Sequence, residues 1–307
     1  MKCPTLQKLP SPPPKKKGWP WTEESSQQSP QLSDRLSDDS EWPKISIVTP
    51  SYNQGEFLEE TIRSVLLQGY PNLEYIIIDG GSTDNSIEII RQYEPWLTYW
   101  ISEPDRGQSD AIQKGFDRSS GQIMGWLNSD DLLEPLALLT LSSIYQPGCH
   151  WWKGDAKHIL ADGTIKTYKQ SPLEITRNEL LHARLILTQV STFWTRELWH
   201  QAGGYISNLN FAMDYELWLR FSNYTSVTTI ESVLGRYRTH DRAKTGTQQG
   251  QVLYFQECDR LRQKEYQKQR QGKLQRFFLI SFWTRRFLAN TYDGWRSWIG
   301  RRKIPYV

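Results

Sequence analysis

The sequence predicts an α/β fold in which a mostly parallel, doubly wound sheet is flanked by helices. Three observations favour it. Strand-like and helix-like segments alternate from about residue 45 to residue 127, the connections between them are short, and one strand-like run is continuously apolar. A continuous apolar run is typical of a strand buried on both faces of a parallel sheet. The 307 residues allow one large or two small domains with a substantial core.

Each expected element rests on a local pattern. Proline ends the first strand, the first helix carries an apolar stripe of Leu58, Ile62, Val65 and Leu66, and a glycine turn at 80–84 follows the second strand. The expected order is strand 45–50, helix 57–68, strand 75–79, helix 86–93, strand 97–101, helix 109–116 and strand 122–127.

The alternation loosens beyond Pro147. Segments 151–160 and 164–169 are separated by Ala-Asp-Gly, which predicts a β-hairpin. Further expected elements are strand 192–195, helix 196–202, a helical stretch within 211–221, strand 226–231 and a helix from about 248.

We therefore predict three parts. Residues 1–42 contain a Pro-Pro-Pro-Lys-Lys-Lys run and a Ser-, Gln- and Asp-rich stretch, and are expected to be a disordered tail. Residues 43–245 form the folded domain. Residues 246–307 form a helical, aromatic and basic C-terminal extension.

Composition narrows the class of protein. A net charge of +3 gives no reason to expect nucleic-acid binding. The three cysteines are far apart, which argues against a disulfide framework and a zinc site. No run approaches the roughly 18 apolar residues of a membrane span, and the first residues lack a secretory apolar stretch. We expect a cytoplasmic location. The 14 tryptophans suit sugar stacking, membrane interfaces or core packing.

Polar residues follow three of the predicted strands, at 49–53, 79–82 and 128–131. Ligands of open parallel sheets bind beyond the carboxyl ends of the strands, so these residues predict a binding site at one edge. For each segment alone, ordinary helix capping is the alternative.

The acidic end of the fourth strand is the most informative of the three. Asp130 and Asp131 follow a buried apolar strand, and neighbouring carboxylates repel one another unless a cation or protons intervene. Hard oxygen ligands suit Mn²⁺ or Mg²⁺, which usually also hold substrate phosphates. The glycine-rich loops of P-loop phosphotransferases and of dinucleotide dehydrogenases are absent from the sequence.

Five segments occur in order along the chain: VTPSYN (48–53), IDGGSTD (78–84), WLNSDD (126–131), AMDYELWLR (212–220) and GRYRTH (235–240). Together they resemble glycosyltransferase family 2, whose members have the GT-A fold, a Rossmann-like sheet with flanking helices. The resemblance covers residues 44–245.

This resemblance implies a role for individual residues. The nucleotide-sugar donor would be bound by Thr49, Pro50, Ser51, Tyr52, Asp79, Asn128 and Ser129. Asp130 would be the principal metal ligand with Asp131 beside it, and Asp214 would be the general base, a role compatible with capping a helix. Three positions depart from the family pattern, which often has an acid where this chain has Gly80, Asn128 and Met213.

A further segment, 104–110, resembles a family loop near the donor, and Gln108 within it is expected to bind the donor. Arg106 and Lys114 could compensate phosphate charge, or equally form surface salt bridges. His240 could contact the metal or diphosphate, as in some relatives, or be structural. Residues 189–193 are interpreted as part of the acceptor site.

The resemblance implies an inverting, non-processive enzyme of polysaccharide or glycolipid biosynthesis. It would move a sugar from a nucleotide-diphosphate donor to a hydroxyl of a glycan or lipid-linked acceptor. The alternatives are a degenerate carbohydrate-binding relative and a nucleotidyltransferase.

The C-terminal extension suggests a further partner. Residues 275–303 are apolar, aromatic and basic, so they could lie on an anionic membrane at its inner face. The alternative is a helix packed on the catalytic domain.

Overall fold

The computed structural model describes residues 3–25, 41–168, 174–182 and 187–279. The chain divides into two compact units, Met1–Cys258 and Asp259–Val307, and the division falls within the last helix, α8 (Gln248–Leu279). All the residues of the candidate site lie in the first unit.

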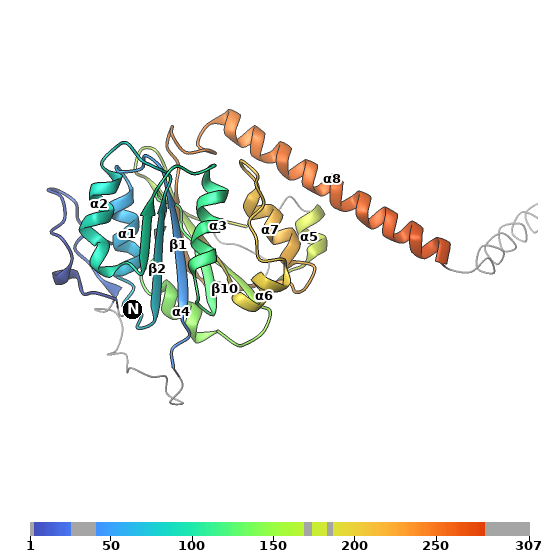
Figure 1. Cartoon of the computed structure of the whole chain (residues 1–307), viewed down its shortest axis with the longest axis horizontal. Helices are drawn as coiled ribbons and strands as arrows, with labels where there is room; N and C mark the ends of the chain where they lie inside the picture. The colour runs from blue at the N-terminus through green and yellow to red at the C-terminus, as the bar shows by residue number, and fades with distance from the viewer. Residues whose placement is uncertain (1–2, 26–40, 169–173, 183–186, 280–307) are drawn as a thin grey trace, which may run out of the picture. The chain divides into compact units, whose positions relative to one another are not determined.

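One mixed sheet forms the centre of this unit (Figure 1). Its strand order is β3-β2-β1-β4-β9-β6-β10-β5, with β7 beside β6 and β8 beside β10. The strands are β1 (Ile45–Ser51), β2 (Leu73–Asp79), β3 (Tyr99–Ser102), β4 (Ile123–Trp126), β5 (Leu132–Leu133), β6 (Trp151–Ile159), β7 (Ile165–Tyr168), β8 (Glu174–Ile175), β9 (Thr192–Thr195) and β10 (Val227–Arg238).

The first half of the sheet has the predicted doubly wound form. Strands β1 to β4 are parallel, and every residue of β1 and β2 is buried. Helices α1 (Leu58–Leu66) and α2 (Ser86–Tyr93) pack on one face together with Ile47 and Tyr75. Helix α3 (Gln108–Arg118) covers the other face, where Gly115 lies so close to Val48 that a Cβ on it would be 2.3 Å from Val48 Cγ1.

The second half mixes strand directions. Strand β9 runs antiparallel to β4 and β6, and β6 runs parallel to β10. Strand β10 extends well past the expected 226–231, because register shifts after Ile230 and Val233 let it continue beside β6 as far as Arg238. The predicted hairpin is confirmed as β6–β7.

Short helices support this second half: α4 (Ala137–Ser143), α5 (Arg177–His182), α6 (Arg196–Gln201), α7 (Met213–Phe221) and the 3-10 turn η4 (Gln189–Ser191). Two further 3-10 turns, η1 (Leu6–Lys8) and η3 (Glu94–Trp96), lie on the first half. The expected fold class, an α/β sheet of GT-A type with flanking helices, is confirmed.

Five tryptophans form an aromatic core between the second half of the sheet and helices α3, α6 and α7. Trp126 stacks on Trp218 with ring centroids 6.0 Å apart, and Trp194 contacts both rings edge-on. Trp151 and Trp199 complete the cluster. Core packing therefore accounts for these five tryptophans, one of the three uses that the composition left open.

Residues 3–25 depart from the expected disordered tail. The guanidinium group of Arg63, fully buried in α1, donates hydrogen bonds to the carbonyl oxygens of Pro10, Pro20 and Trp21. Trp19 Nε1 donates to the Leu133 carbonyl at 2.8 Å. A buried guanidinium needs acceptors, and this segment supplies them, so it is ordered against α1. Residues 26–40 of the predicted tail lie outside the described residues.

The predicted extension corresponds in part to α8. Of the expected membrane-contact segment 275–303, residues 280–303 lie outside the described residues, and 275–279 end α8. Within the described ranges, no helix has both the length and the apolar character needed to cross a bilayer.

Candidate active site

The carboxyl ends of β1, β2 and β4 meet at one edge of the sheet. Ser51 pairs in register with Asp79, and the Gly80 N–H donates to the Ser51 carbonyl at 2.8 Å. The Leu127 N–H donates to the Val48 carbonyl at 2.9 Å, which brings β4's end to the same edge. The structure thus brings together the three polar segments that the sequence placed there.

The acidic end of β4 is held by a network of amide groups. Asn128 Nδ2 donates to Asp131 Oδ2 at 3.0 Å, and Asn128 Oδ1 accepts from Gln108 Nε2 at 2.8 Å. Gln189 Nε2 donates to the Trp126 carbonyl at 2.8 Å. Asn128, where the family often has an acid, therefore ties α3 and η4 to the acidic end.

Asp130 faces His240, two residues past the end of β10. Asp130 Oδ2 and His240 Nε2 are 3.0 Å apart, and the imidazole packs on Phe57 with ring centroids 4.5 Å apart. His240 Nδ1 is buried and, among the described residues, has no hydrogen-bond partner. An unsatisfied buried nitrogen is costly, so it marks a place where a further group would be stabilised.

Arg238 fixes the main chain of this segment. Its Nε donates to the Asp130 carbonyl, its N–H donates to Asp131 Oδ1, and its Nη2 pairs with Glu60 Oε2, each at 3.0 Å. Neither Arg238 nor Glu60 was expected at the site from the sequence. Arg238 lies within the GRYRTH segment, so the motif held the signal for it, whereas nothing in α1 distinguished Glu60 from a solvated acid.

Burial and the adjacent Asp130 raise the pKa of Asp131 well above its ordinary value. Both Asp131 oxygens already accept hydrogen bonds, from the Arg238 N–H and from Asn128. Asp131 thus stabilises the loop, whereas the Asp130 carboxylate lies beside the imidazole of His240. Ser129 is buried, and its carbonyl accepts from Thr61 Oγ1.

The residues expected to bind the nucleotide are exposed to different degrees. Thr49 is buried with its hydroxyl 3.1 Å from the Tyr75 hydroxyl, and Pro50 is buried beside it. Ser51 Oγ is buried and has no hydrogen-bond partner within the described ranges. Tyr52 is 59% exposed, so its ring is available as a stacking surface at the edge of the sheet.

Asp79 is used by the turn that follows β2. Its Oδ2 accepts from the Gly81 N–H, the Ser82 N–H and Ser102 Oγ, and its Oδ1 accepts from Ser82 Oγ. The side chain is fully buried. These bonds close a turn in which Gly81 has a φ of +83°, a conformation that glycine adopts readily.

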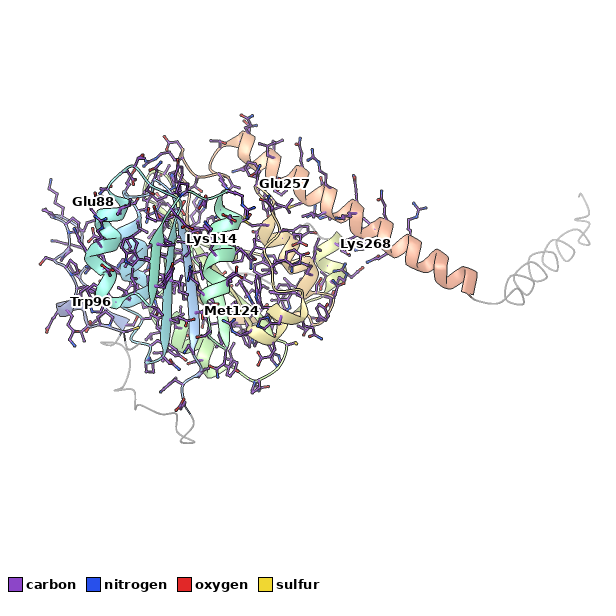
Figure 2. The ribbon with its side chains drawn as sticks, in the orientation of Figure 1. Glu88, Trp96, Lys114, Met124, Glu257 and Lys268 are labelled. Carbon is purple, nitrogen blue, oxygen red and sulfur yellow. The ribbon has the colours of Figure 1, made fainter. Side chains whose placement is uncertain are left out.

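Of the residues expected in the donor loop, only Gln108 reaches the acidic end. Arg106 is 85% exposed and pairs with Asp110 at 2.6 Å. Lys114, on α3 (Figure 2), pairs with Glu103 at 2.9 Å and with Asp110 at 3.5 Å. The structure therefore shows the salt bridges that the sequence left open for both cations.

Asp214 lies in the first turn of α7, where Ala212 is the N-cap residue and makes no side-chain capping bond. Glu257 of α8 caps the helix instead, because its Oε2 accepts from the N–H groups of Phe211 and Ala212 at 3.0 and 2.9 Å (Figure 2). Burial, with a contribution from the charge of Glu257, raises the pKa of Asp214 to about 7. Sequence reasoning missed Glu257 because it lies over 40 residues from the helix that it caps.

The base segment and the acidic end are joined through α3. Gln108 contacts Asn128, and its neighbour Ser109 contacts the Met213 sulfur at 3.2 Å. One turn of helix therefore touches both segments and fixes their relative position.

Comparison with known proteins gives the family of this site. The family model described as glycosyl transferase family 2 matches residues 46–146, which include the ends of β1, β2 and β4. An uncharacterized glycosyltransferase of Mycobacterium tuberculosis is 29% identical over 202 residues, covering 64% of this chain and 76% of the relative. These similarities support a family 2 glycosyltransferase, with the family's domain at residues 46–146.

Two solved glycosyltransferase structures resemble this one. TarS 1–349 of S. aureus, in complex with UDP-GlcNAc, aligns with a TM-score of 0.54 at 17% identity, over 65% of this chain and 60% of TarS 1–349. The mannosyltransferase PcManGT from Pyrobaculum calidifontis, in complex with GDP-Man and Mn²⁺, aligns with a TM-score of 0.54 at 18% identity, over 77% and 70% of the two chains. This chain thus spans less than two thirds of TarS, and the likeness establishes the GT-A fold.

The family 2 site has few candidate metal ligands of its own. Within the described ranges, no group of three or more His, Cys, Asp and Glu side chains is arranged to hold a metal ion. Asp130 and His240 nevertheless offer an oxygen and a nitrogen 3.0 Å apart. Mg²⁺ is commonly held by one or two carboxylates together with substrate phosphates and water, so a small protein donor set fits a phosphate-bound ion.

Proposed function

We propose that this family 2 glycosyltransferase transfers a sugar, with inversion, from a nucleotide-diphosphate donor to a hydroxyl of a glycan or lipid-linked acceptor. The observation that carries the proposal is the link through α3, in which Gln108 and Ser109 join the acidic end of β4 to the helix that carries Asp214. A transferase of this kind needs a diphosphate-binding group and a base at fixed separation.

The donor would bind at the edge formed by β1, β2 and β4. Tyr52 presents an exposed ring for the base, and the buried Ser51 hydroxyl lacks a partner within the described ranges. Asn128 and Gln108 already bond one another, so they would line the sugar-diphosphate side. Asp79 and the buried Thr49, Pro50 and Ser129 would shape the pocket from behind rather than contact the donor directly.

Asp130 and His240 would hold Mn²⁺ or Mg²⁺, with Asp131 keeping their loop in place. When bound, such an ion neutralises the charge of the nucleoside diphosphate that leaves. Arg106 and Lys114 would contribute long-range positive charge only, because both are paired with carboxylates.

Asp214 would be the general base. The acceptor hydroxyl gives its proton to the Asp214 carboxylate while its oxygen bonds to the anomeric carbon. The bond from that carbon to the diphosphate oxygen breaks, and the nucleoside diphosphate leaves with the bonding electrons. Attack from the face opposite the leaving group inverts the anomeric centre.

A donor screen tests the proposal. The full chain is incubated with Mn²⁺ and a panel of UDP-, GDP-, ADP-, CDP- and dTDP-sugars, with and without oligosaccharide acceptors, and release of nucleoside diphosphate is measured. We expect metal-dependent release from one donor class. With pyrophosphate added, conversion of the donor to a nucleoside triphosphate and a sugar 1-phosphate would indicate a nucleotidyltransferase, and metal-independent glycan binding without turnover would indicate a degenerate binding protein.

A further inference from the structure

The carboxylate of Asp105 lies where a side chain on residue 80 would be, at the end of β2. A Cβ placed on Gly80 would lie 2.7 Å from Asp105 Oδ2 and 3.0 Å from Asp105 Cγ. Heavy atoms do not approach that closely, so an aspartate at position 80 would make the flexible Asp105 side chain leave its present position. Gly80 is not in the left-handed backbone region, so glycine is favoured here by this side-chain contact and not by a positive φ.

The loops that carry the two residues are packed together. The Glu103 N–H donates to the Asp79 carbonyl at 3.0 Å, and a Cβ on Gly81 would lie 3.3 Å from the Pro104 nitrogen. The two residues before Asp105 are therefore packed against the β2 turn, which places Asp105 beside it. It lies at the same edge of the sheet as Ser51, whose carbonyl accepts from the Gly80 N–H.

One of the two carboxylate oxygens of Asp105 accepts a hydrogen bond. Its Oδ1 accepts from the Gly107 N–H at 2.8 Å, whereas its Oδ2 makes no hydrogen bond to any described residue. The side chain is partly exposed. Asp79, by contrast, is fully buried and uses both oxygens in the turn. Of the two acids, only Asp105 has an oxygen that accepts no hydrogen bond from the described residues, and its charge also interacts with the Lys244 ammonium group.

We propose that Asp105 supplies the carboxylate that recognises the nucleoside of the donor. A carboxylate oxygen accepts hydrogen bonds from a base N–H or from a ribose hydroxyl, and accepts none from a diphosphate. This inference rests on the proposed function and names the group within it that reads the nucleoside.

Calorimetry with the full chain tests it. The probes are UDP, GDP, ADP, CDP and dTDP, each with Mn²⁺, and pyrophosphate with Mn²⁺ as the probe without a nucleoside. Asp105→Asn keeps an oxygen that can accept from Gly107, so the loop is retained while the charge is lost. Glu88→Gln, at an exposed position of α2 (Figure 2), is the matched control that removes one negative charge elsewhere.

We expect Asp105→Asn to weaken the preferred nucleoside diphosphate by about 10- to 100-fold, the effect of losing a hydrogen bond to a charged group. Pyrophosphate binding and the Glu88→Gln variant should be unchanged. If the 2′-deoxy form of the preferred nucleotide binds Asp105→Asn and the parent chain equally, the carboxylate reads the ribose; if the loss persists, it reads the base.

An exchange variant gives a second readout. Gly80→Asp alone should weaken the nucleotide because the new side chain collides with Asp105, and Gly80→Asp with Asp105→Gly should recover it to within about threefold of the parent, less than 1 kcal/mol. Nucleotide affinity unaffected by Asp105→Asn, or an equal loss of pyrophosphate affinity, would overturn the inference and leave the proposed function standing. A parent chain that binds no nucleoside diphosphate would overturn both.

Discussion

The candidate site has a donor end, at the ends of β1, β2 and β4, and a base end, at the start of α7. Buried carboxylates at these two ends differ in their hydrogen bonding. Asp79 and Asp131 accept hydrogen bonds from main-chain N–H groups and polar side chains on both oxygens. Asp214 accepts from the Tyr215 N–H and has a second acid, Glu257, nearby. Burial raises the pKa of both Asp131 and Asp214, so the difference lies in hydrogen bonding: Asp79 and Asp131 are held in place through both oxygens, whereas Asp214 accepts from the N–H of the next residue.

This difference in hydrogen bonding distinguishes aspartates that fix loop geometry from aspartates that could bind a metal ion or accept a proton. The sequence alone does not distinguish them. Satisfied carboxylates at the ends of β2 and β4 fix loop geometry. Asp130 lies beside His240, and Asp214 has a pKa of about 7. These two acids are therefore the candidates for metal binding and for proton transfer. If this division is right, substituting the acids should produce different kinds of loss.

The largest effect is expected for Asp214→Asn. Loss of the base should lower kcat by about a thousandfold, within the range of about 10²–10⁴ for general acid–base catalysis. Donor binding should be retained. Diphosphate release under saturating donor measures the change, with Asp117→Asn, at an exposed position of α3, as the control. A variant with near-normal kcat would remove Asp214 from the base role.

Asp130→Asn should act on binding. Removing the charge that faces His240 should weaken Mn²⁺-dependent nucleotide binding about 30-fold, which corresponds to roughly 2 kcal/mol. Titration with the preferred nucleoside diphosphate in Mn²⁺ and in EDTA checks this. If the two conditions give the same loss, Asp130 does not act through a metal ion.

Asp79→Asn should act on stability. The amide oxygen can keep the Gly81 and Ser82 N–H bonds, but its NH2 group then replaces the oxygen that accepts from Ser82 Oγ, and the charge is lost. The free energy of unfolding should therefore fall by about 2 kcal/mol, or about 4–8 °C in Tm. Thermal unfolding measures it. Folded Asp79→Asn protein that has lost nucleotide affinity with an unchanged Tm would contradict this and give Asp79 a direct role with the donor.

The smallest effect is expected for Glu257→Gln, in the pH dependence of kcat/KM. Activity of the parent should rise with pH through about 7, as Asp214 loses its proton. The negative charge of Glu257 raises the pKa of Asp214, so the glutamine variant should shift this limb to lower pH by less than about one unit. The amide oxygen can still cap α7. A shift to higher pH would contradict the predicted direction. An equal shift in Glu88→Gln would show that the effect is not specific to Glu257.

Much of the fold could be predicted because its elements carry local signals. The apolar runs of β1 and β2 and the stripe of α1 gave the parallel half, and Ala161-Asp162-Gly163 gave the β6–β7 hairpin. The length of β10 could not be predicted, since it depends on register shifts beside β6. The order of residues 3–25 depends on Arg63, whose need for acceptors is invisible until α1 is known to be buried.

The site divides in the same way. Motifs made Asp130, Asp214 and His240 candidates, because each lies in a contiguous segment with its own pattern. Arg238, Glu257 and Asp105 act across long sequence separations, through contacts with Asp131, the start of α7 and Gly80. Only the folded chain shows which donors an acid has, and hence which acids remain available.

One titration tests the division between donor end and base end most directly. The preferred nucleoside diphosphate with Mn²⁺ is titrated into the parent chain, Asp214→Asn and Asp130→Asn under identical conditions. We predict that Asp214→Asn binds within about twofold of the parent and that Asp130→Asn binds about 30-fold more weakly. Equal losses in the two variants would show that donor holding and proton acceptance are not separated in this enzyme.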